Sequence, residues 1–150
     1  RDVLPPLRGV PKLCDQVSTD VFLIKLTPGL SPTVFDKLCE MGYRGVVIEA
    51  FGVGGMHFLH RDLAGKVRML AERGVSVVTC SQCLYDGSNL DVYEVGKRLL
   101  GVGVIQGYDM TTEAAVTKLM WALGNGMDPA QIRHFFAQSV AGEILLTPDD

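Results

Sequence analysis

The stretch that decides the fold is GVVIEAFGVGGMH, which runs from Gly45 to His57. Its first part holds VVI at positions 46–48, a β-branched apolar run that is typical of a strand buried on both faces. Its second part holds GVGG at positions 52–55, where glycines allow the backbone to turn sharply and another group to come close to it. Because ligands and partners meet an open parallel sheet at the carboxyl ends of its strands, the stretch predicts a buried strand that leads into a functional loop.

Strand and helix signals alternate on both sides of this stretch. Apolar β-branched runs predict strands, whereas apolar residues at helical spacing, bounded by cap residues or glycines, predict helices. The expected strands are 21–26, 45–51, 75–80 and 102–105, and the expected helices are 32–41, 63–73, 92–100, 112–123 and 129–138. The predicted fold class is therefore α/β, a small parallel sheet of about four strands with helices on both faces, in a three-layer arrangement like that of Rossmann or flavodoxin folds.

Cap residues predict where three of the helices begin. Ser31 is expected to cap the first helix, with Pro32 at its first helical position. Asp109 or Thr111 is expected to cap the fourth helix, and Asp128, which proline follows, is expected to cap the fifth.

Composition excludes several classes of function. The 150 residues are enough for one domain, and 47% of them are hydrophobic, which indicates buried strands together with an interface to a part that this chain lacks. No apolar run approaches the roughly 18 residues of a membrane helix, so no membrane contact is expected. A net charge of −3 offers no basic surface for nucleic acid. Four cysteines do not make a disulfide framework, so reduced thiols in a cytoplasmic protein are expected.

Several patterns carry chemistry only in part. Cys80 and Cys83 have the CxxC spacing of a redox pair or half a zinc site, but no helix clearly begins at the first cysteine and no second CxxC follows. His57 and His60 lack a convincingly spaced third metal ligand. The GVGG turn is neither a dinucleotide fingerprint nor a phosphate loop with its lysine, so a structural or interface role is favoured. We therefore expect neither a metal nor a cofactor.

Glu49 is unusual because it lies inside the apolar strand of the opening stretch. Either the strand ends there and the carboxylate faces the mouth of the loop, or the buried acid has a partner.

Taken together, five motifs occur in an order that resembles one family. They are IKLTPGLSP (24–32), GVVIEAFGVGG (45–55), SQC (81–83), GVIQGYDMTTEAAVTKL (103–119) and GEILLTPDD (142–150). This set is similar to the C-terminal domain of L-asparaginases of the bacterial cytoplasmic, type I kind. The resemblance begins near Val21, which divides the chain into an arm or interdomain linker, residues 1–20, and an α/β domain, residues 21–150.

The resemblance implies hydrolysis of L-asparagine to L-aspartate and ammonia by the complete protein. The family's nucleophilic threonine belongs to a larger N-terminal domain that no stretch here matches, so we expect no catalytic residue in this chain and no activity alone. A start at Arg1 instead of Met, followed by prolines, agrees with a missing N-terminal half. The resemblance also implies a homo-oligomer, a dimer or tetramer, in which the glycine turn approaches a neighbour's active site. Gly55 and His57 occupy the region where the secreted type has a substrate-binding asparagine.

Some cytoplasmic members also bind asparagine as an effector in this domain. Ser81 and Cys83 match that pocket, whereas Glu49 stands where the pattern has an arginine. An arginine suits a carboxylate ligand, and a glutamate would repel it by about 1 kcal/mol or more near a surface. We therefore expect the response to asparagine to be lost or altered.

Three other interpretations stay open from the sequence. The first is the asparaginase-like subunit of an archaeal-type glutamyl-tRNA amidotransferase, which shares the architecture, although the SQC and tail motifs favour an asparaginase. The second is a non-catalytic ligand-binding or scaffold module. The third is a CxxC redox protein, which requires a thiol pKa well below about 8.5 at Cys80 or Cys83. The preference between asparagine and glutamine is not encoded in these motifs.

Overall fold

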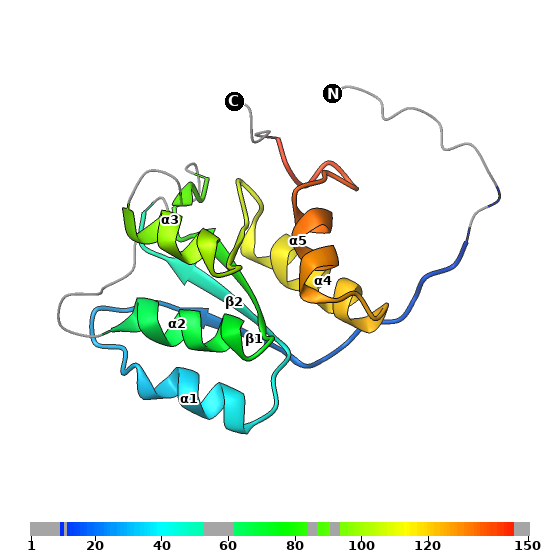
Figure 1. Cartoon of the computed structure of the whole chain (residues 1–150). Helices are drawn as coiled ribbons and strands as arrows, with labels where there is room; N and C mark the ends of the chain where they lie inside the picture. The colour runs from blue at the N-terminus through cyan, green and yellow to red at the C-terminus, as the bar shows by residue number, and fades with distance from the viewer. Residues whose placement is uncertain (1–9, 11, 53–61, 84–86, 91–93, 146–150) are drawn as a thin grey trace.

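Nine helices and strands follow one another along the described part of the chain, which a computed structural model gives as residues 10, 12–52, 62–83, 87–90 and 94–145. The elements are β1 (Val21–Lys25), α1 (Thr33–Glu40), β2 (Gly45–Ala50), α2 (Leu63–Glu72), β3 (Ser76–Ser81), α3 (Glu94–Gly101), β4 (Ile105–Gln106), α4 (Thr112–Gly124) and α5 (Pro129–Phe136). The sheet lies between α1, α2 and α3 on one face and α4 and α5 on the other (Figure 1). The expected α/β architecture is confirmed.

The four strands form one parallel sheet in the order β1-β2-β3-β4. Each strand is added beside the one before it, so the three connecting helices lie on a single face. This order differs from that of Rossmann and flavodoxin folds, in which the strand order reverses at a switch point. The carboxyl ends of all four strands therefore form one continuous edge.

The core is divided by the sheet, and β2 contributes to both halves. Val46 and Ile48 pack toward α1, α2 and α3, whereas Val47 packs toward α4 and α5. Because side chains alternate along a strand, Glu49 lies on the same face as Val47. Gly45–Ala50, the first part of the stretch from Gly45 to His57, is thus a central strand that is buried on both faces, as its sequence predicts.

Two cap predictions are confirmed, and one helix start is shifted. Thr111, not Asp109, caps α4, since its Oγ1 accepts from the backbone N–H of Ala114 at 3.2 Å. Asp128 caps α5 in a capping box. The prediction for the first helix is wrong by one residue: the helix begins at Thr33, its N-cap residue is Pro32 and not Ser31, and it has no side-chain cap bond.

The predicted strand at 102–105 is wrong in its bounds. Val102 and Gly103 belong to the turn that ends α3, where their N–H groups donate to Leu99 and Leu100 at 3.2 and 3.0 Å. Gly103 has φ +100°, which an extended strand does not adopt. The strand is therefore Ile105–Gln106, because the first half of the apolar run belongs to this turn.

The segment before β1 is attached to α4. The indole N–H of Trp121 donates to the Cys14 carbonyl at 2.7 Å, and the Ser18 N–H donates to the Met120 carbonyl at 2.9 Å. The backbone of this segment at Gln16 and Val17 lies so close to α4 that a Cβ added at Gly124 would come within 2.5 Å of it.

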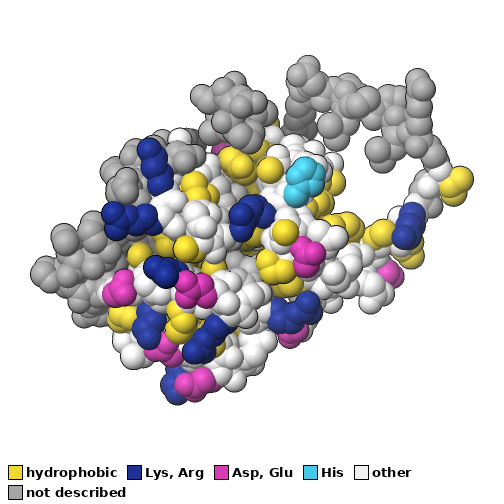
Figure 2. All heavy atoms as spheres, in the orientation of Figure 1, with side chains coloured by type: hydrophobic (Ala, Val, Ile, Leu, Met, Phe, Trp, Pro, Cys, Tyr) yellow, Lys and Arg dark blue, Asp and Glu magenta, His cyan; other side chains and the backbone are white. Residues whose placement is uncertain are grey.

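Charges of both signs alternate over α1 and α2, at the lower left of Figure 2. The pairs are Lys37–Glu40, Lys66–Asp36 and Arg68–Glu72. In the described part of the chain, no helix has the length and apolar character needed to cross a bilayer.

Candidate functional site

The predicted site residues that the structure describes gather at the carboxyl edge of the sheet. Glu49 is the next-to-last residue of β2, Ser81 is the last residue of β3, and Cys83 follows two residues later. Glu49 is the cross-strand partner of Lys25 on one side and of Cys80 on the other. The Lys25 cation, the Glu49 carboxylate and the Cys80 thiol therefore lie next to one another on three neighbouring strands.

The Glu49 carboxylate has two partners inside the chain. Its Oε2 lies 3.2 Å from Lys25 Nζ, and its Oε1 accepts a 2.7 Å hydrogen bond from Thr112 Oγ1. Its side chain is 18% exposed. Thr112 is the first residue of α4, so the carboxylate lies near the N-terminal end of a helix, where negative charge is stabilised. The partner that a partly buried acid requires is therefore present.

Ser81 connects the end of β3 to the glycine turn. Its hydroxyl donates to the Gly52 carbonyl at 2.6 Å and accepts from the Cys83 N–H at 2.9 Å. Gly52 has φ +50°, a conformation that favours glycine. Ser81 thereby holds the first residue of the turn, while Gly55 and His57 lie outside the described residues.

Gln82, which the sequence did not single out, joins three strands. Its Nε2 donates to the carbonyls of Leu26 and Glu49, both at 2.8 Å. Its backbone N–H donates to the Ala50 carbonyl at 3.0 Å. One side chain therefore fixes the ends of β1, β2 and β3 relative to one another. Its place inside the SQC motif was the available signal.

The two cysteines of the CxxC pattern have opposite surroundings. Burial, with a smaller contribution from the Glu49 charge, raises the pKa of Cys80 to about 12. Cys83 is exposed. A redox pair needs a lowered thiol pKa at its nucleophile, and for Cys80 the shift has the opposite sign. Among the described residues, no group of three His, Cys, Asp or Glu side chains has a geometry that could hold a metal ion.

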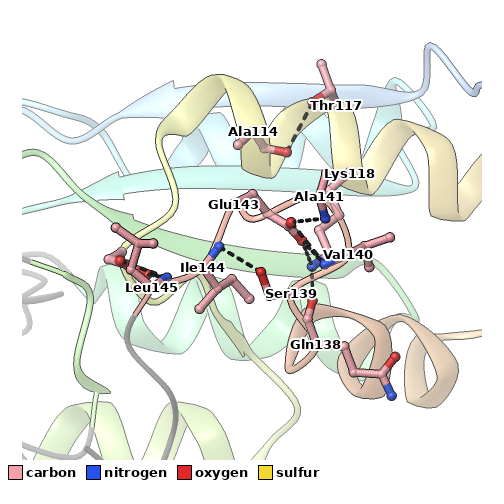
Figure 3. Close-up of polar contacts among 11 residues, drawn as sticks. Ala114, Thr117, Lys118, Gln138, Ser139, Val140, Ala141, Glu143, Ile144 and Leu145 are labelled. Carbon is pink, nitrogen blue, oxygen red and sulfur yellow. Dashed lines mark hydrogen bonds and ion pairs between the residues drawn. The ribbon is translucent and has the colours of Figure 1, made fainter. Parts of the chain in front are cut away.

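A buried ion pair outside this edge was also missed by sequence reasoning (Figure 3). Lys118 Nζ lies 2.5 Å from Glu143 Oε1 and donates to the Gln138 carbonyl at 2.6 Å. The rings of Phe135 and Phe136 lie 4.9 and 5.3 Å from the ammonium. The Lys118 and Glu143 side chains are only 6% and 13% exposed. The signal in the sequence was a lysine beside Leu119 on the apolar face of the fourth helix.

Glu143 is held as an anion by groups of its own loop as well. Burial favours its neutral form, but hydrogen bonds from Lys118 and from the N–H groups of Ala141 and Val140 outweigh burial and lower its pKa to about 2. Ala141 N lies 2.7 Å from Oε2, and Val140 N lies 3.1 and 3.0 Å from the two oxygens. The carboxylate is therefore charged throughout the neutral range.

The chain matches the glutaminase/asparaginase C-terminal domain family over residues 20–136. It belongs to this family. An L-asparaginase of Thermococcus kodakarensis is 43% identical over 136 residues, which are 91% of this chain and 41% of that protein. A glutamyl-tRNA(Gln) amidotransferase subunit of Pyrococcus horikoshii is 39% identical over 130 residues, 87% of this chain and 29% of that protein.

Solved structures agree with this membership. The thermostable L-asparaginase of Thermococcus kodakarensis superposes with a TM-score of 0.81 at 40% identity, over 94% of this chain and 44% of that chain. L-asparaginase I of Vibrio cholerae superposes with a TM-score of 0.81 at 31% identity, over 93% of this chain and 42% of that chain. The chain thus spans less than half the length of each of these relatives.

Proposed function

We propose that this chain is the C-terminal half of an L-asparaginase, which hydrolyses L-asparagine to L-aspartate and ammonia, and that it is inactive without the N-terminal catalytic domain. The observation that carries the proposal is the 43% identity to an L-asparaginase over 91% of this chain, which covers only 41% of that relative. The chain would then supply scaffold and loop contacts, while the nucleophilic threonine would come from the other half.

The test is ammonia release from L-asparagine, measured with the 150-residue chain alone and with the complete protein that contains it. We expect ammonia only from the complete protein. Thr112 is the control, because its hydroxyl already donates to the Glu49 carboxylate and could be mistaken for an activated nucleophile. Ammonia release by the chain alone that Thr112→Val abolishes would place the chemistry in this half and overturn the proposal.

We further propose that the complete protein is a cytoplasmic homo-oligomer, a dimer or tetramer, in which the glycine turn faces a neighbouring subunit. The exposed apolar side chains Leu23 and Met41, which are 45% and 66% exposed, support an interface beyond this chain. Four free cysteines support a reducing compartment. Sedimentation equilibrium of the complete protein tests the assembly, and a monomer at micromolar concentration would contradict it.

A second candidate is the asparaginase-like subunit of a glutamyl-tRNA amidotransferase. The observation that favours it is that amidotransferase relatives of this kind, from Pyrococcus horikoshii and Methanopyrus kandleri, are 39% and 37% identical to the chain. This candidate predicts ammonia transfer to glutamyl-tRNA when a companion subunit is added. Asparagine hydrolysis that no companion subunit alters would favour the first candidate.

We propose that asparagine does not act as an effector at Ser81, Cys83 and Glu49. The Glu49 carboxylate is already held by Lys25 and Thr112, and a free carboxylate brought beside it would be repelled. Calorimetric titration of the chain with asparagine should give no saturable heat, and Glu49→Arg should introduce it. The proposal would be contradicted if asparagine bound stoichiometrically to the unaltered chain and Glu49→Arg abolished that binding.

A further inference from the structure

The segment after α5 folds back over α4 and α5, and we call residues 139–145 the C-terminal strap (Figure 3). The strap places the Glu143 carboxylate against Lys118, whose side chain is 6% exposed. Lys118 is a buried cation surrounded by two aromatic rings, with the Gln138 carbonyl as its second acceptor. A cation in such a site requires an anion, because an unpaired buried charge is strongly destabilising.

The Glu143 carboxylate is bound as a free carboxylate would be. One ammonium and the N–H groups of Val140 and Ala141 converge on its two oxygens, which is the donor set of an anion site built from backbone and a charged side chain. Gly142, at φ +79°, turns the backbone so that Glu143 meets the N–H groups that precede it. All the donors of a carboxylate-binding site are thus present, and the carboxylate that they bind belongs to the chain itself.

The far end of the strap is attached to the loop that precedes α4. The Leu145 N–H donates to both carboxylate oxygens of Asp109, each at 3.1 Å. Asp109 lies two residues before Thr111, which caps α4, and Thr112 follows with its bond to Glu49. The strap therefore spans from the Lys118 site to the loop beside the carboxyl edge of the sheet.

We propose that Lys118 and the surrounding groups form a carboxylate-binding socket, and that Glu143 is its tethered ligand, which holds the C-terminal strap closed. The ligand class is a small monocarboxylate. The inference does not depend on the reaction of the complete protein, because it concerns only groups within this chain. The socket differs from a static ion pair in one respect: a carboxylate from solution can bind to Lys118 when Glu143 is absent.

The first test removes the tether and adds a free ligand. Glu143→Ala leaves Lys118 without its carboxylate and makes room for acetate, which would draw the Val140 and Ala141 N–H groups back to the site. Glu143→Gln keeps the socket filled by an amide of the same shape. Urea unfolding of both variants and the unaltered chain is followed against sodium acetate, with sodium chloride at equal ionic strength as the reference.

We expect a millimolar Kd for acetate on Glu143→Ala, the affinity range of a ligand of so few atoms. At about ten times that Kd, acetate should raise the folded-to-unfolded ratio of Glu143→Ala about tenfold and should leave Glu143→Gln and the unaltered chain unchanged. An equal response of all three proteins, or none in any of them, overturns the proposal.

A second measurement does not require a variant to fold. Hydrogen exchange of the unaltered chain should show the Val140, Ala141 and Leu145 N–H groups exchanging together and at least tenfold faster than the core amides of α4, as expected for a strap that opens locally. Exchange of these groups only through global unfolding, at the same protection as α4, would show a static element and contradict the tethered-ligand account.

Discussion

Lys118→Met removes the cation of the buried ion pair while keeping an apolar side chain of similar length. The Glu143 carboxylate, 13% exposed, would then keep its backbone donors but lose its charged partner. In the unaltered chain, the difference between the ordinary pKa of 4.5 and the folded value of about 2 corresponds to about 3 kcal/mol of stability at neutral pH. This contribution is shared between Lys118 and the backbone N–H groups of Val140 and Ala141, which the variant keeps. Loss of one partner of a buried pair costs about 3–5 kcal/mol, so we expect Lys118→Met to lose an amount near the lower end of that range.

The pH dependence gives the sharper test. Because the folded pKa of Glu143 lies below the unfolded pKa, its contribution is present above pH 4.5 and is lost as the pH falls toward 2. In Lys118→Met, burial without the cation raises the pKa of Glu143 relative to the unaltered chain, so acid should cost the variant less stability. The difference between the two proteins should therefore be about 3 kcal/mol at pH 7 and should shrink toward zero near pH 2 to 3.

Urea unfolding of both proteins between pH 7 and pH 2.5 measures this difference. Lys37→Met is the matched control, because Lys37 pairs with Glu40 on the surface, where both side chains are more than half exposed, and its removal should change little. A difference below about 1 kcal/mol at pH 7, or one that stays constant down to pH 3, would refute the assigned role of the Lys118–Glu143 pair.

Three further predictions concern the carboxyl edge of the sheet. Gly107→Ala should destabilise the fold by about 1–3 kcal/mol in thermal unfolding, because the added Cβ would come within 2.8 Å of Cys80 Sγ and of the Thr79 carbonyl oxygen. Gly29→Ala is the control and should not destabilise the fold, because the space around its Cβ position is open. Gln82→Glu should lower the free energy of unfolding by about 2 kcal/mol or more at pH 7, because a carboxylate cannot donate to the two carbonyls now bound at 2.8 Å; unchanged stability would remove Gln82 from the account. Alkylation at pH 8, followed by mass spectrometry, should modify exposed Cys83 well before Cys80, whose pKa is about 12, and faster modification of Cys80 would contradict its assigned environment.

Local patterns predicted the parts of the fold that are locally determined. The β-branched run of β2 is buried on both faces, and the proline after Asp128 marks the start of α5, because both signals act within a few residues. The predicted bounds of β4 are wrong because the apolar run at 102–105 includes a turn, in which Gly103 has a positive φ. Strand order did not follow from the sequence either, since pairing depends on where whole helices pack.

The polar network at the site was less predictable. Glu49 stands out as an acid inside an apolar strand, and Ser81 matches the effector pocket that the resemblance implies. Their partners Thr112 and Gly52, however, lie 63 and 29 residues away. The same holds for Lys118 and Glu143, which are 25 residues apart. Such pairs form only after the helices have packed on the sheet, so no local period or cap signal reports them.

We propose above that this chain supports a catalytic centre that another domain supplies. Ammonia release from L-asparagine by the purified 150-residue chain tests it most directly, at a chain concentration high enough to detect a single turnover. We expect no ammonia from the chain above the rate in buffer, together with turnover by the complete protein. Multiple turnovers by the chain alone would contradict it.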